Sequence, residues 1–366
     1  MDAGELGAWL RLLHAPGVGR ETARRLLSAF GSPQAVLAAD EPALALAAGP
    51  QLAPALQAAE REAVDHTERA WAWLHAGPDR HVITLGDPAY PPPLLESPDP
   101  PLLLFVRGRL EALAGPAVAV VGSRRPTAQG RDHARQFARA LAADRWTVVS
   151  GLATGVDGAA HEGALEAGGI TVAVTGTGPD RVYPARHADL ARRIAERGAL
   201  VTEFMPGTPP LPAHFPQRNR IIAGLCQGTL VVEAALQSGS LITARLANEA
   251  GRDVFAIPGS VLSEQSRGCH ALIRDGARLI ETPQELLDEL RQAPLPGLQP
   301  LAAAAAAPPP QDPVLEALGH DPVSLDSLSA RTGWPANELL ARLLELELEG
   351  RAARLPGGLY QRRGMA

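Results

Sequence analysis

The sequence predicts an α/β protein with a Rossmann-like, doubly wound and mostly parallel sheet at its centre, an N-terminal helical domain and a C-terminal winged helix. Short apolar runs rich in β-branched residues recur along the middle of the chain, and helical segments rich in alanine, leucine and arginine separate them. Continuous apolar strands that alternate with helices are typical of a parallel sheet covered on both faces. The predicted strands are 117–121, 147–149, 170–174, 200–202, 229–232 and 254–257.

The chain has 366 residues, which exceeds what one hydrophobic core ordinarily supports, so several domains are expected. We predict a helical domain over 1–84, the α/β core over 85–290, a linker rich in alanine and proline over 291–312, and the winged helix over 313–366. Within the core, the proline-rich stretch 85–116 is expected to be extended.

The first domain contains two apolar helical stretches around the turn Pro16-Gly17-Val18-Gly19. Such a turn can present backbone N–H groups to a phosphate, as in helix-hairpin-helix modules. The acidity of this region favours the alternative, a small helical bundle without a ligand. In the last domain, three helical segments precede a hairpin that turns at Pro356-Gly357-Gly358, which is the pattern of a winged helix.

The composition limits the chemistry that the chain can carry out. All 34 basic residues are arginine, so catalysis by a lysine is excluded, while the planar guanidinium suits phosphate. The net charge is −6, but residues 117–290 carry 18 arginines and 18 carboxylates, so an anion site would be local. Cys226 and Cys269 have no metal-ligand spacing, and no apolar run is long enough for a membrane span. We expect a cytoplasmic protein without metal, cofactor or membrane partner.

Loops rich in glycine, hydroxyl groups and arginine follow the predicted strands, and ligands of open α/β sheets bind at these carboxyl ends. Gly122-Ser123-Arg124-Arg125 follows the first strand and opens a helix, a pattern that favours an oxyanion site. Ser150–Gly155 follows the second strand, Gly176-Thr177-Gly178 the third, and Ser238-Gly239-Ser240 the fifth. Loops that converge on one edge predict a binding site there.

Two further groups of residues near this edge have alternative interpretations. Asp157 and His161 are spaced i,i+4, and a buried hydrogen bond between them that fixes the loop is favoured over a metal pair. Arg218 and Arg220 flank Asn219 in a stretch that begins at Phe215, so phosphate binding and base stacking are expected there. One of these arginines is predicted to point outward, and the other to pair with Glu203 or Glu233 and brace the fold.

No Walker A sequence, recognisable Ser–His–Asp set or Asp-rich metal cluster occurs in the chain, so we expect no enzyme activity. The first alternative to a binding protein without enzyme activity is an enzyme of the phosphoribohydrolase-like Rossmann group, which binds nucleotides at the same edge of the sheet. Its PGGxGT signature is absent, because Gln227-Gly228-Thr229 lacks the preceding glycines. The second alternative is a scaffold that binds other proteins and has little affinity for nucleic acid.

Long motifs in the core resemble the DNA processing protein A family, also called Smf, from about Tyr90 to Glu281. They are VAVVGSRRPTAQG at 118–130, VVSGLATGVDGAAHEGAL at 148–165, VYP at 182–184, HFPQRNRIIAGL at 214–225, LVVEAALQSGSLITARLA at 230–247 and VFAIPG at 254–259. The resemblance implies a core that binds single-stranded DNA without sequence preference, protects incoming DNA and loads the RecA recombinase onto it in natural transformation and recombination. It also implies a SAM-like N-terminal domain and a homodimer formed through the late part of the core.

The residues expected to contact DNA combine the loops above with this resemblance. They are Gly122, Ser123, Arg124, Arg125, Ser150, Gly151, Ala153, Thr154, Gly155, Phe215, Gln217, Arg218, Asn219, Arg220, Ser238, Gly239 and Ser240. Leu272, Ile273 and Leu279 are expected in the dimer interface.

The sequence departs from the family's pattern at two places. Thr154 stands where relatives often carry lysine. The surface expected to contact the DNA backbone therefore has one cation fewer. The third helix of the winged helix carries Glu338, Glu345, Glu347 and Glu349 against Arg342 alone. A helix that reads DNA is normally basic, so a protein-contact or regulatory module is favoured over duplex DNA binding, which stays a further alternative.

Overall fold

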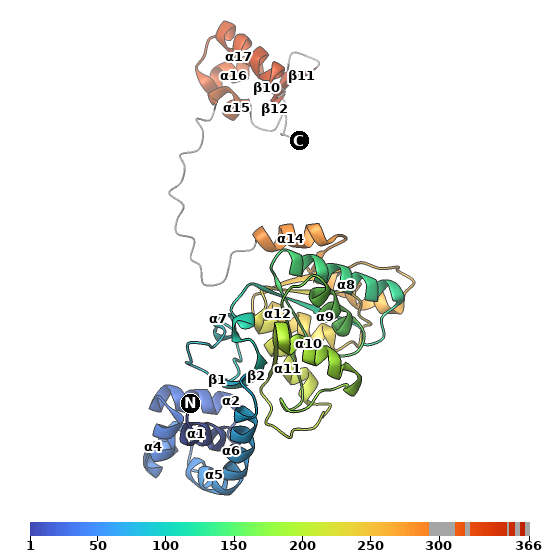
Figure 1. The fold of residues 1–366 in the computed structure, drawn as a ribbon. Coiled ribbons are helices and arrows are strands. Elements are labelled where there is room, and N and C mark those ends of the chain that lie inside the picture. Colours follow the sequence, from blue (N-terminus) through green and yellow to red (C-terminus); the bar gives the residue numbers. More distant parts are fainter. Residues whose placement is uncertain (293–311, 319–322, 350, 356–358, 363–366) are drawn as a thin grey trace. The chain divides into compact units, whose positions relative to one another are not determined.

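The computed structural model describes residues 1–292, 312–318, 323–349, 351–355 and 359–362. They belong to two compact units, Met1–Gly297 and Leu298–Ala366, which are described separately below (Figure 1). The helical domain expected over 1–84 and the core expected over 85–290 both lie in the first unit. Among the described residues, no helix has the length and apolar character that crossing a membrane requires.

The first unit contains a nine-stranded sheet in the order β1-β2-β6-β5-β4-β3-β7-β8-β9. Strands β3 to β9 run parallel to one another, whereas β2 is antiparallel to both of its neighbours, β1 and β6, so the sheet is mostly parallel as predicted. The six predicted strands are present as β3 (Ala117–Val121), β4 (Thr147–Ser150), β5 (Thr171–Val174), β6 (Ala199–Thr202), β7 (Gly228–Val231) and β8 (Asp253–Ala256).

Three strands of this sheet were not predicted: β1 (Arg80–Thr84), β2 (Leu103–Gly108) and the two-residue β9 (Arg278–Leu279). Residues 80–84, expected to be helical, instead pair with β2 at the edge of the sheet. The surrounding prolines concealed β2, whose side chains alternate between two cores. Leu103 and Phe105 face the N-terminal helices, whereas Leu104 and Val106 face the central core.

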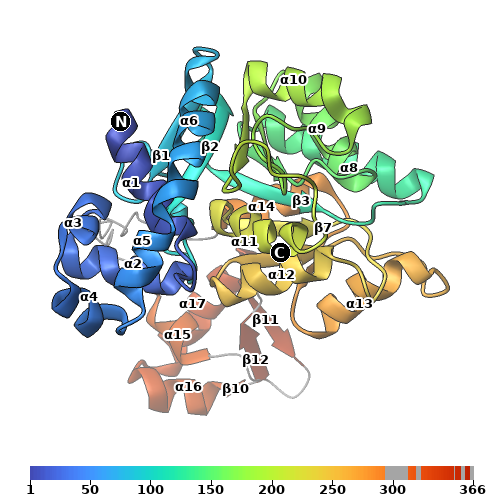
Figure 2. The same cartoon turned by 90° about the horizontal axis from the view of Figure 1, so that it is seen from below.

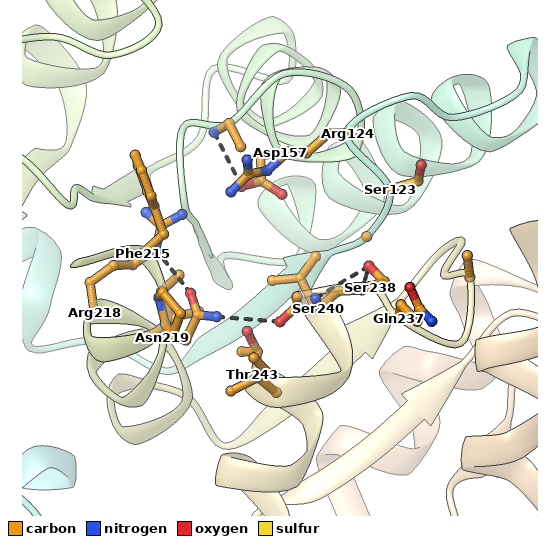
Figure 3. Close-up of a pocket in the computed structure, with 18 of the residues that line it drawn as sticks. Ser123, Arg124, Asp157, Phe215, Arg218, Asn219, Gln237, Ser238, Ser240 and Thr243 are labelled. Atoms are coloured by element: carbon orange, nitrogen blue, oxygen red, sulfur yellow. Dashed lines mark hydrogen bonds between the residues drawn. The ribbon is translucent and has the colours of Figure 1, made fainter. Parts of the chain in front are cut away.

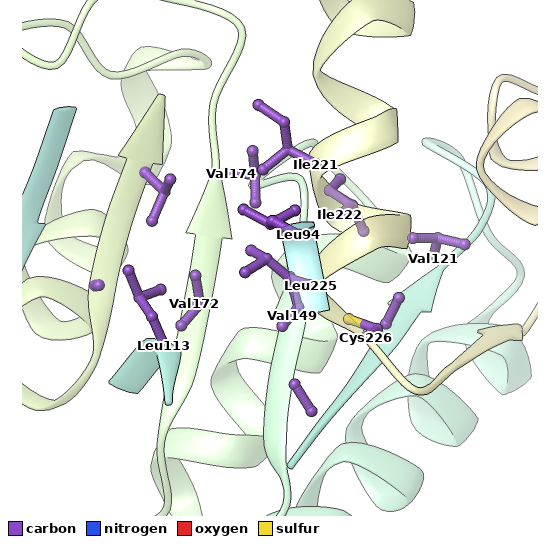
Figure 4. Close-up of a cluster of buried hydrophobic side chains, with 14 of the residues drawn as sticks. Leu94, Leu113, Val121, Val149, Val172, Val174, Ile221, Ile222, Leu225 and Cys226 are labelled. Atoms are coloured by element: carbon purple, nitrogen blue, oxygen red, sulfur yellow. The ribbon is translucent and has the colours of Figure 1, made fainter. Parts of the chain in front are cut away.

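Helices cover both faces of the sheet, and successive side chains of β3 point alternately to the two helical layers. Val118 and Val120 pack beneath α8 (Ala128–Ala143), α9 (Val156–Glu166) and α14 (Pro283–Gln292). Ala119 and Val121 face the opposite layer, in which Ile221, Ile222 and Leu225 of α11 lie against the sheet (Figure 4). That layer comprises α7 (Pro92–Leu95), α11 (His214–Leu225), α12 (Ser240–Glu249) and α13 (Arg267–Arg274), and α10 (Ala188–Arg197) lies beside α9. Short 3₁₀ helices occur at Leu110–Leu113, Ala185–His187 and Glu264–Ser266.

The strand order creates a topological switch point between β3 and β7. From β3 the chain adds β4, β5 and β6 on one side, and it then crosses over to add β7, β8 and β9 on the other. The connections after β3 and β7 therefore leave the sheet toward opposite faces and open a crevice between them. Open α/β sheets bind ligands at such crevices.

The N-terminal helices gather at the antiparallel end of the sheet, where α6 lies beside β1 (Figure 2). They are α1 (Ala3–His14), α2 (Arg20–Phe30), α3 (Pro33–Ala38), α4 (Glu41–Ala48), α5 (Leu52–Ala58) and α6 (Glu60–His75). The Trp73 ring meets the Phe105 ring of β2 edge-on, with centroids 5.5 Å apart. Helices and sheet thus share one hydrophobic cluster.

The second unit comprises α15 (Pro313–Leu318), β10 (Val323–Ser324), α16 (Leu325–Thr332), α17 (Ala336–Leu348), β11 (Ala352–Leu355) and β12 (Leu359–Arg362). Three helices and a small sheet of order β10-β12-β11 confirm the predicted winged helix. Residues 293–311 of the predicted linker and the predicted turn at 356–358 lie outside the described residues.

Candidate functional site

A cleft of about 710 Å³ lies at the switch point, at the carboxyl ends of β3 and β7. Figure 3 shows Phe215, Arg218 and Asn219 on one side of it, and Gln237 and Ser238 on the other. The expected DNA-contacting residues that line it are Gly122, Ser123, Arg124, Arg125, Ala153, Phe215, Arg218, Asn219, Ser238, Gly239 and Ser240. Ser150, Gly151, Thr154, Gly155, Gln217 and Arg220 lie behind or beside this lining.

The loop after β3 is held against the loop after β7 by backbone hydrogen bonds. The N–H of Ser123 donates to the carbonyl of Glu233 over 2.7 Å. A Cβ atom on Gly122 would lie 2.8 Å from that same oxygen, so the close approach requires glycine. The Glu233 carboxylate accepts from the N–H of Thr127, which places its charge at the N-terminus of α8. Arg124 and Arg125 remain exposed at the rim of the cleft.

The loop after β4 is organised by Asp157, but the predicted hydrogen bond between Asp157 and His161 is absent. An oxygen of Asp157 accepts from the N–H groups of Gly151 at 3.1 Å and Ala153 at 3.2 Å. One helical turn later, the Nδ1 of His161 instead bonds Thr171 Oγ1 at the start of β5, over 2.7 Å. Burial lowers the pKa of His161 to about 3, so the ring is neutral. The described residues contain no group of three or more side chains arranged to hold a metal ion.

Thr154 and Gly155 support the site without lining it. The hydroxyl of Thr154 donates to the carbonyl of Arg124 over 3.0 Å, which ties the loop after β4 to the loop after β3. Gly155 has a φ of +87°, and a Cβ there would lie 2.3 Å from the carbonyl oxygen of Ser123. Ser150 is fully buried, and its hydroxyl donates to the carbonyl of Val120.

The prediction that one of the two α11 arginines points outward is wrong, because Arg218 and Arg220 are both buried. Arg218 is 4% exposed and donates to the carbonyl of Gly151 over 2.6 Å and also to that of Val174. A Cβ on Gly151 would overlap this guanidinium. Burial lowers the pKa of Arg218 to about 10, while the carboxylate of Asp157 opposes the shift, so Arg218 stays charged at neutral pH.

Arg220 is the bracing arginine that the sequence predicted, and its partner is Glu203 rather than Glu233. Its Nη1 and Nη2 atoms lie 2.7 and 2.6 Å from the two Glu203 oxygens, and its Nε lies 2.8 Å from Asp99. The two arginines lie two positions apart on α11 and point to different neighbours. The exposed cations of the site are supplied instead by the loop after β3.

An aromatic pair forms one wall of the cleft. Phe215 is partly exposed, and the guanidinium carbon of Arg124 lies 5.4 Å from its ring centroid. The Tyr183 ring, 48% exposed, lies 5.6 Å from the Phe215 ring. Sequence reasoning assigned no role to Tyr183, although it lies in the VYP motif at 182–184. It also assigned no role to Gln237, which lines the opposite side.

Hydroxyl and amide groups connect this opposite side to α11. The Ser238 and Ser240 hydroxyl oxygens lie 2.7 Å apart, and Asn219 Nδ2 donates to the carbonyl of Gly239 over 3.3 Å (Figure 3). The cleft thus combines exposed arginines, an aromatic wall and small residues that allow close approach of a ligand.

A family model described as DNA recombination-mediator protein A matches residues 81–291. The chain belongs to this family. Residues 299–358 match a DprA winged helix domain, and residues 10–49 match a SAM-like helix-hairpin-helix tandem. The family resemblance deduced from the motifs, and the SAM-like first domain that it implies, are therefore confirmed.

Relatives and solved structures that are similar to this chain support its membership of the family. Protein Smf of Escherichia coli is 44% identical over 305 residues, 81% of each chain. DNA processing protein DprA of Streptococcus pneumoniae is 50% identical over 203 residues, 56% of this chain and 72% of that protein. An X-ray structure of the Streptococcus pneumoniae protein superposes with a TM-score of 0.69 at 38% identity, over 77% of this chain and 97% of that one. A Helicobacter pylori DNA processing protein A, described for its single-stranded DNA binding mode, has a TM-score of 0.53 at 29% identity, over 58% of this chain and 95% of that one.

Asp99 joins the ion pairs behind the cleft, and this makes stability depend on pH. Burial alone would raise the pKa of Asp99, but the hydrogen bond from Arg24 and the charges of Arg220 and Arg20 outweigh it and hold the pKa below 3.8. Stability from a lowered carboxyl pKa is present above pH 3.8 and is lost as the pH falls toward the folded-state value.

We therefore predict that Asp99→Asn is less stable than the wild type at pH 7 by about 1–3 kcal/mol, and that the difference shrinks at pH 3. Urea unfolding at both pH values measures it. Asp189→Asn, which removes an exposed partner of Arg192, is the control and should cost little at either pH. A difference for Asp99→Asn that stays constant or grows on acidification would contradict the assignment.

Proposed function

We propose that this protein binds single-stranded DNA in the cleft without sequence preference, protects incoming DNA and loads the RecA recombinase onto it in natural transformation and recombination. The observation that carries the proposal is the pairing of exposed Arg124 and Arg125 with the partly exposed rings of Phe215 and Tyr183. Phosphates attract guanidinium groups, and any base has a π-face that can stack on an aromatic ring. Neither contact depends on the identity of the base.

The relatives support this function by what their names state. The Helicobacter pylori structure is described for its binding of single-stranded DNA, and the Streptococcus pneumoniae relative is called a DNA processing protein. The family description, recombination mediator, fits the delivery of DNA to a recombinase. The domain boundaries are part of the same proposal, as are action in the cytoplasm and DNA contact by those expected residues that line the cleft.

We propose that the protein does no chemistry on the DNA. Among the residues that line the cleft, all within the described part of the chain, Asp157 is the one carboxylate. Its oxygen already accepts two backbone hydrogen bonds, which suits a structural role. An assay for nucleotide hydrolysis distinguishes this proposal from the phosphoribohydrolase-like alternative.

For the winged helix we propose a protein contact rather than a grip on duplex DNA. The guanidinium of Arg342, on α17, lies 2.6 Å from Asp312 and also pairs with Glu345. Leu340 and Leu344, one turn apart on the same helix, are 44% and 58% exposed. The carboxylates of this helix repel phosphate, whereas its exposed apolar side chains suit contact with another protein. Binding of labelled duplex DNA by the isolated unit would favour the alternative.

Three predictions test the proposed function, and the first concerns the exposed arginines. Arg124→Ala should weaken the binding of oligothymidine and flatten the slope of log affinity against log salt by about 0.7, because one phosphate contact is lost. Fluorescence anisotropy at several salt concentrations measures both. Arg139→Ala is the control, because Arg139 is exposed on α8 and paired with Glu166. Unchanged affinity and slope for Arg124→Ala would remove the loop after β3 from the site.

The second prediction separates stacking from packing. If Phe215 stacks on a base, Phe215→Ala costs about 1–3 kcal/mol of DNA affinity with an unchanged salt slope. The melting temperature should barely move, because the ring is partly exposed. A core role predicts instead a loss of about 3–5 kcal/mol in stability. A large fall in melting temperature on this one variant therefore counts against stacking.

The third prediction concerns self-association. We propose a homodimer through Leu272, Ile273 and Leu279, of which Leu279 lies on the edge strand β9 and is 47% exposed. Light scattering should find Leu279→Arg as a monomer, and a cooperative thermal unfolding transition should show that the variant is folded. A dimer that persists in this variant, at concentrations where the wild type is dimeric, removes β9 from the interface.

A further inference from the structure

A second hollow, of about 400 Å³, lies directly beside the cleft. Pro216 of α11 and Ile242 of α12 line both cavities, so these two residues form a shared threshold between them. The far side of the hollow is formed by Arg20, the first residue of α2, and by residues 97–99. A chain that leaves the cleft across Pro216 and Ile242 thus reaches the N-terminal helices.

Four apolar side chains form part of the walls of the hollow. Pro98 and Pro216 face it from one loop and from α11, and Ile242 and Leu246 face it from α12. Its volume falls within the roughly 300–1,000 Å³ of small-ligand sites. Apolar walls with a few polar groups at the edge accept a flat ring, and Gln217 and Ser97 supply such polar groups.

The floor of the hollow carries a positive charge. Three arginines, Arg20, Arg24 and Arg220, share the two carboxylates of Asp99 and Glu203, so this network has one excess positive charge. Arg20 is its most accessible member, because its side chain is 41% exposed whereas that of Arg220 is 8% exposed. The Nε of Arg20 lies 2.9 Å from Asp99, and its Nη1 lies 3.9 Å from Glu203.

The charges at the rim are arranged asymmetrically. Glu249 lines the hollow on the α12 side, and no described cation lies within ion-pair distance of it. A phosphate is therefore repelled from the α12 side and attracted to Arg20. The hollow can hold a base against its apolar walls while the phosphate lies beside α2.

We propose that this hollow is a second nucleotide subsite, which holds the strand after it leaves the cleft. The inference rests on the proposed function, because it extends the same single strand toward the N-terminal helices. It assigns to Arg20 a contact with phosphate, and to Pro98 and Leu246 a contact with a base. Strands long enough to cross Pro216 and Ile242 engage both cavities, whereas the shortest strands engage only the cleft.

The test is the salt dependence of binding as a function of strand length. Oligothymidines from about 4 to about 16 nucleotides span the site sizes of single-strand binding modules. Arg20→Gln should leave the affinity and salt slope of the shortest strand unchanged, and should flatten the slope for the longest strand by about 0.7. Leu246→Ser should weaken only the longer strands and leave their salt slope unchanged.

Arg25→Gln is the matched control, because Arg25 is exposed on the same helix and the variant removes the same charge. It should bind every length as the wild type does. The inference is overturned if Arg20→Gln binds long strands with the wild-type slope, or if it weakens short and long strands equally. Melting temperatures show that the variants are folded. A wild type that binds no strand of any length would overturn the proposed function itself.

Discussion

The geometry of the cleft depends on the hydrogen bonds that the buried guanidinium of Arg218 donates. This guanidinium joins α11 to the carboxyl ends of β4 and β5 through the carbonyls of Gly151 and Val174. A buried charge is costly unless it is hydrogen-bonded and balanced, and Asp157 supplies the balancing charge from the start of α9. The glycine at 151 is required because any larger residue would displace the guanidinium. Arg218 thus fixes α11 against the carboxyl ends of these two strands at the floor of the cleft.

The proposed binding without base selectivity depends on the division between a buried, hydrogen-bonded arginine at the floor of the cleft and exposed arginines at its rim. Arg124 and Arg125 lie in solvent, where salt screens their charges, so their attraction for phosphates weakens as salt rises. Phe215 and Tyr183 provide a wall on which bases can stack regardless of identity. Behind the wall, Arg220, Glu203 and Asp99 form a compact ion-pair network that fixes α11.

The sequence predicted most of the core, because buried parallel strands are continuous apolar runs that composition reveals directly. The six central strands and the glycine-rich loops at their carboxyl ends were found for this reason. The edge strand β1 was missed because it begins with the polar residues Arg80 and His81 and has no continuous apolar run, and β2 was missed because prolines surround it. The orientation of Arg218 could not be predicted, since burial of an arginine depends on carbonyl groups from strands far away in sequence. The same holds for His161, whose partner Thr171 belongs to the next strand, and for Tyr183, which reaches the cleft through tertiary contact alone.

Hydrogen exchange of the protein with and without a saturating oligothymidine tests the central claim most directly. The account predicts slower exchange of the amides at 121–127, 212–220 and 235–243, which border the cleft, and unchanged exchange in α10, which does not line it. Binding of the oligonucleotide with unchanged exchange in all three segments, and protection elsewhere, would show that the strand binds another surface and would contradict the account.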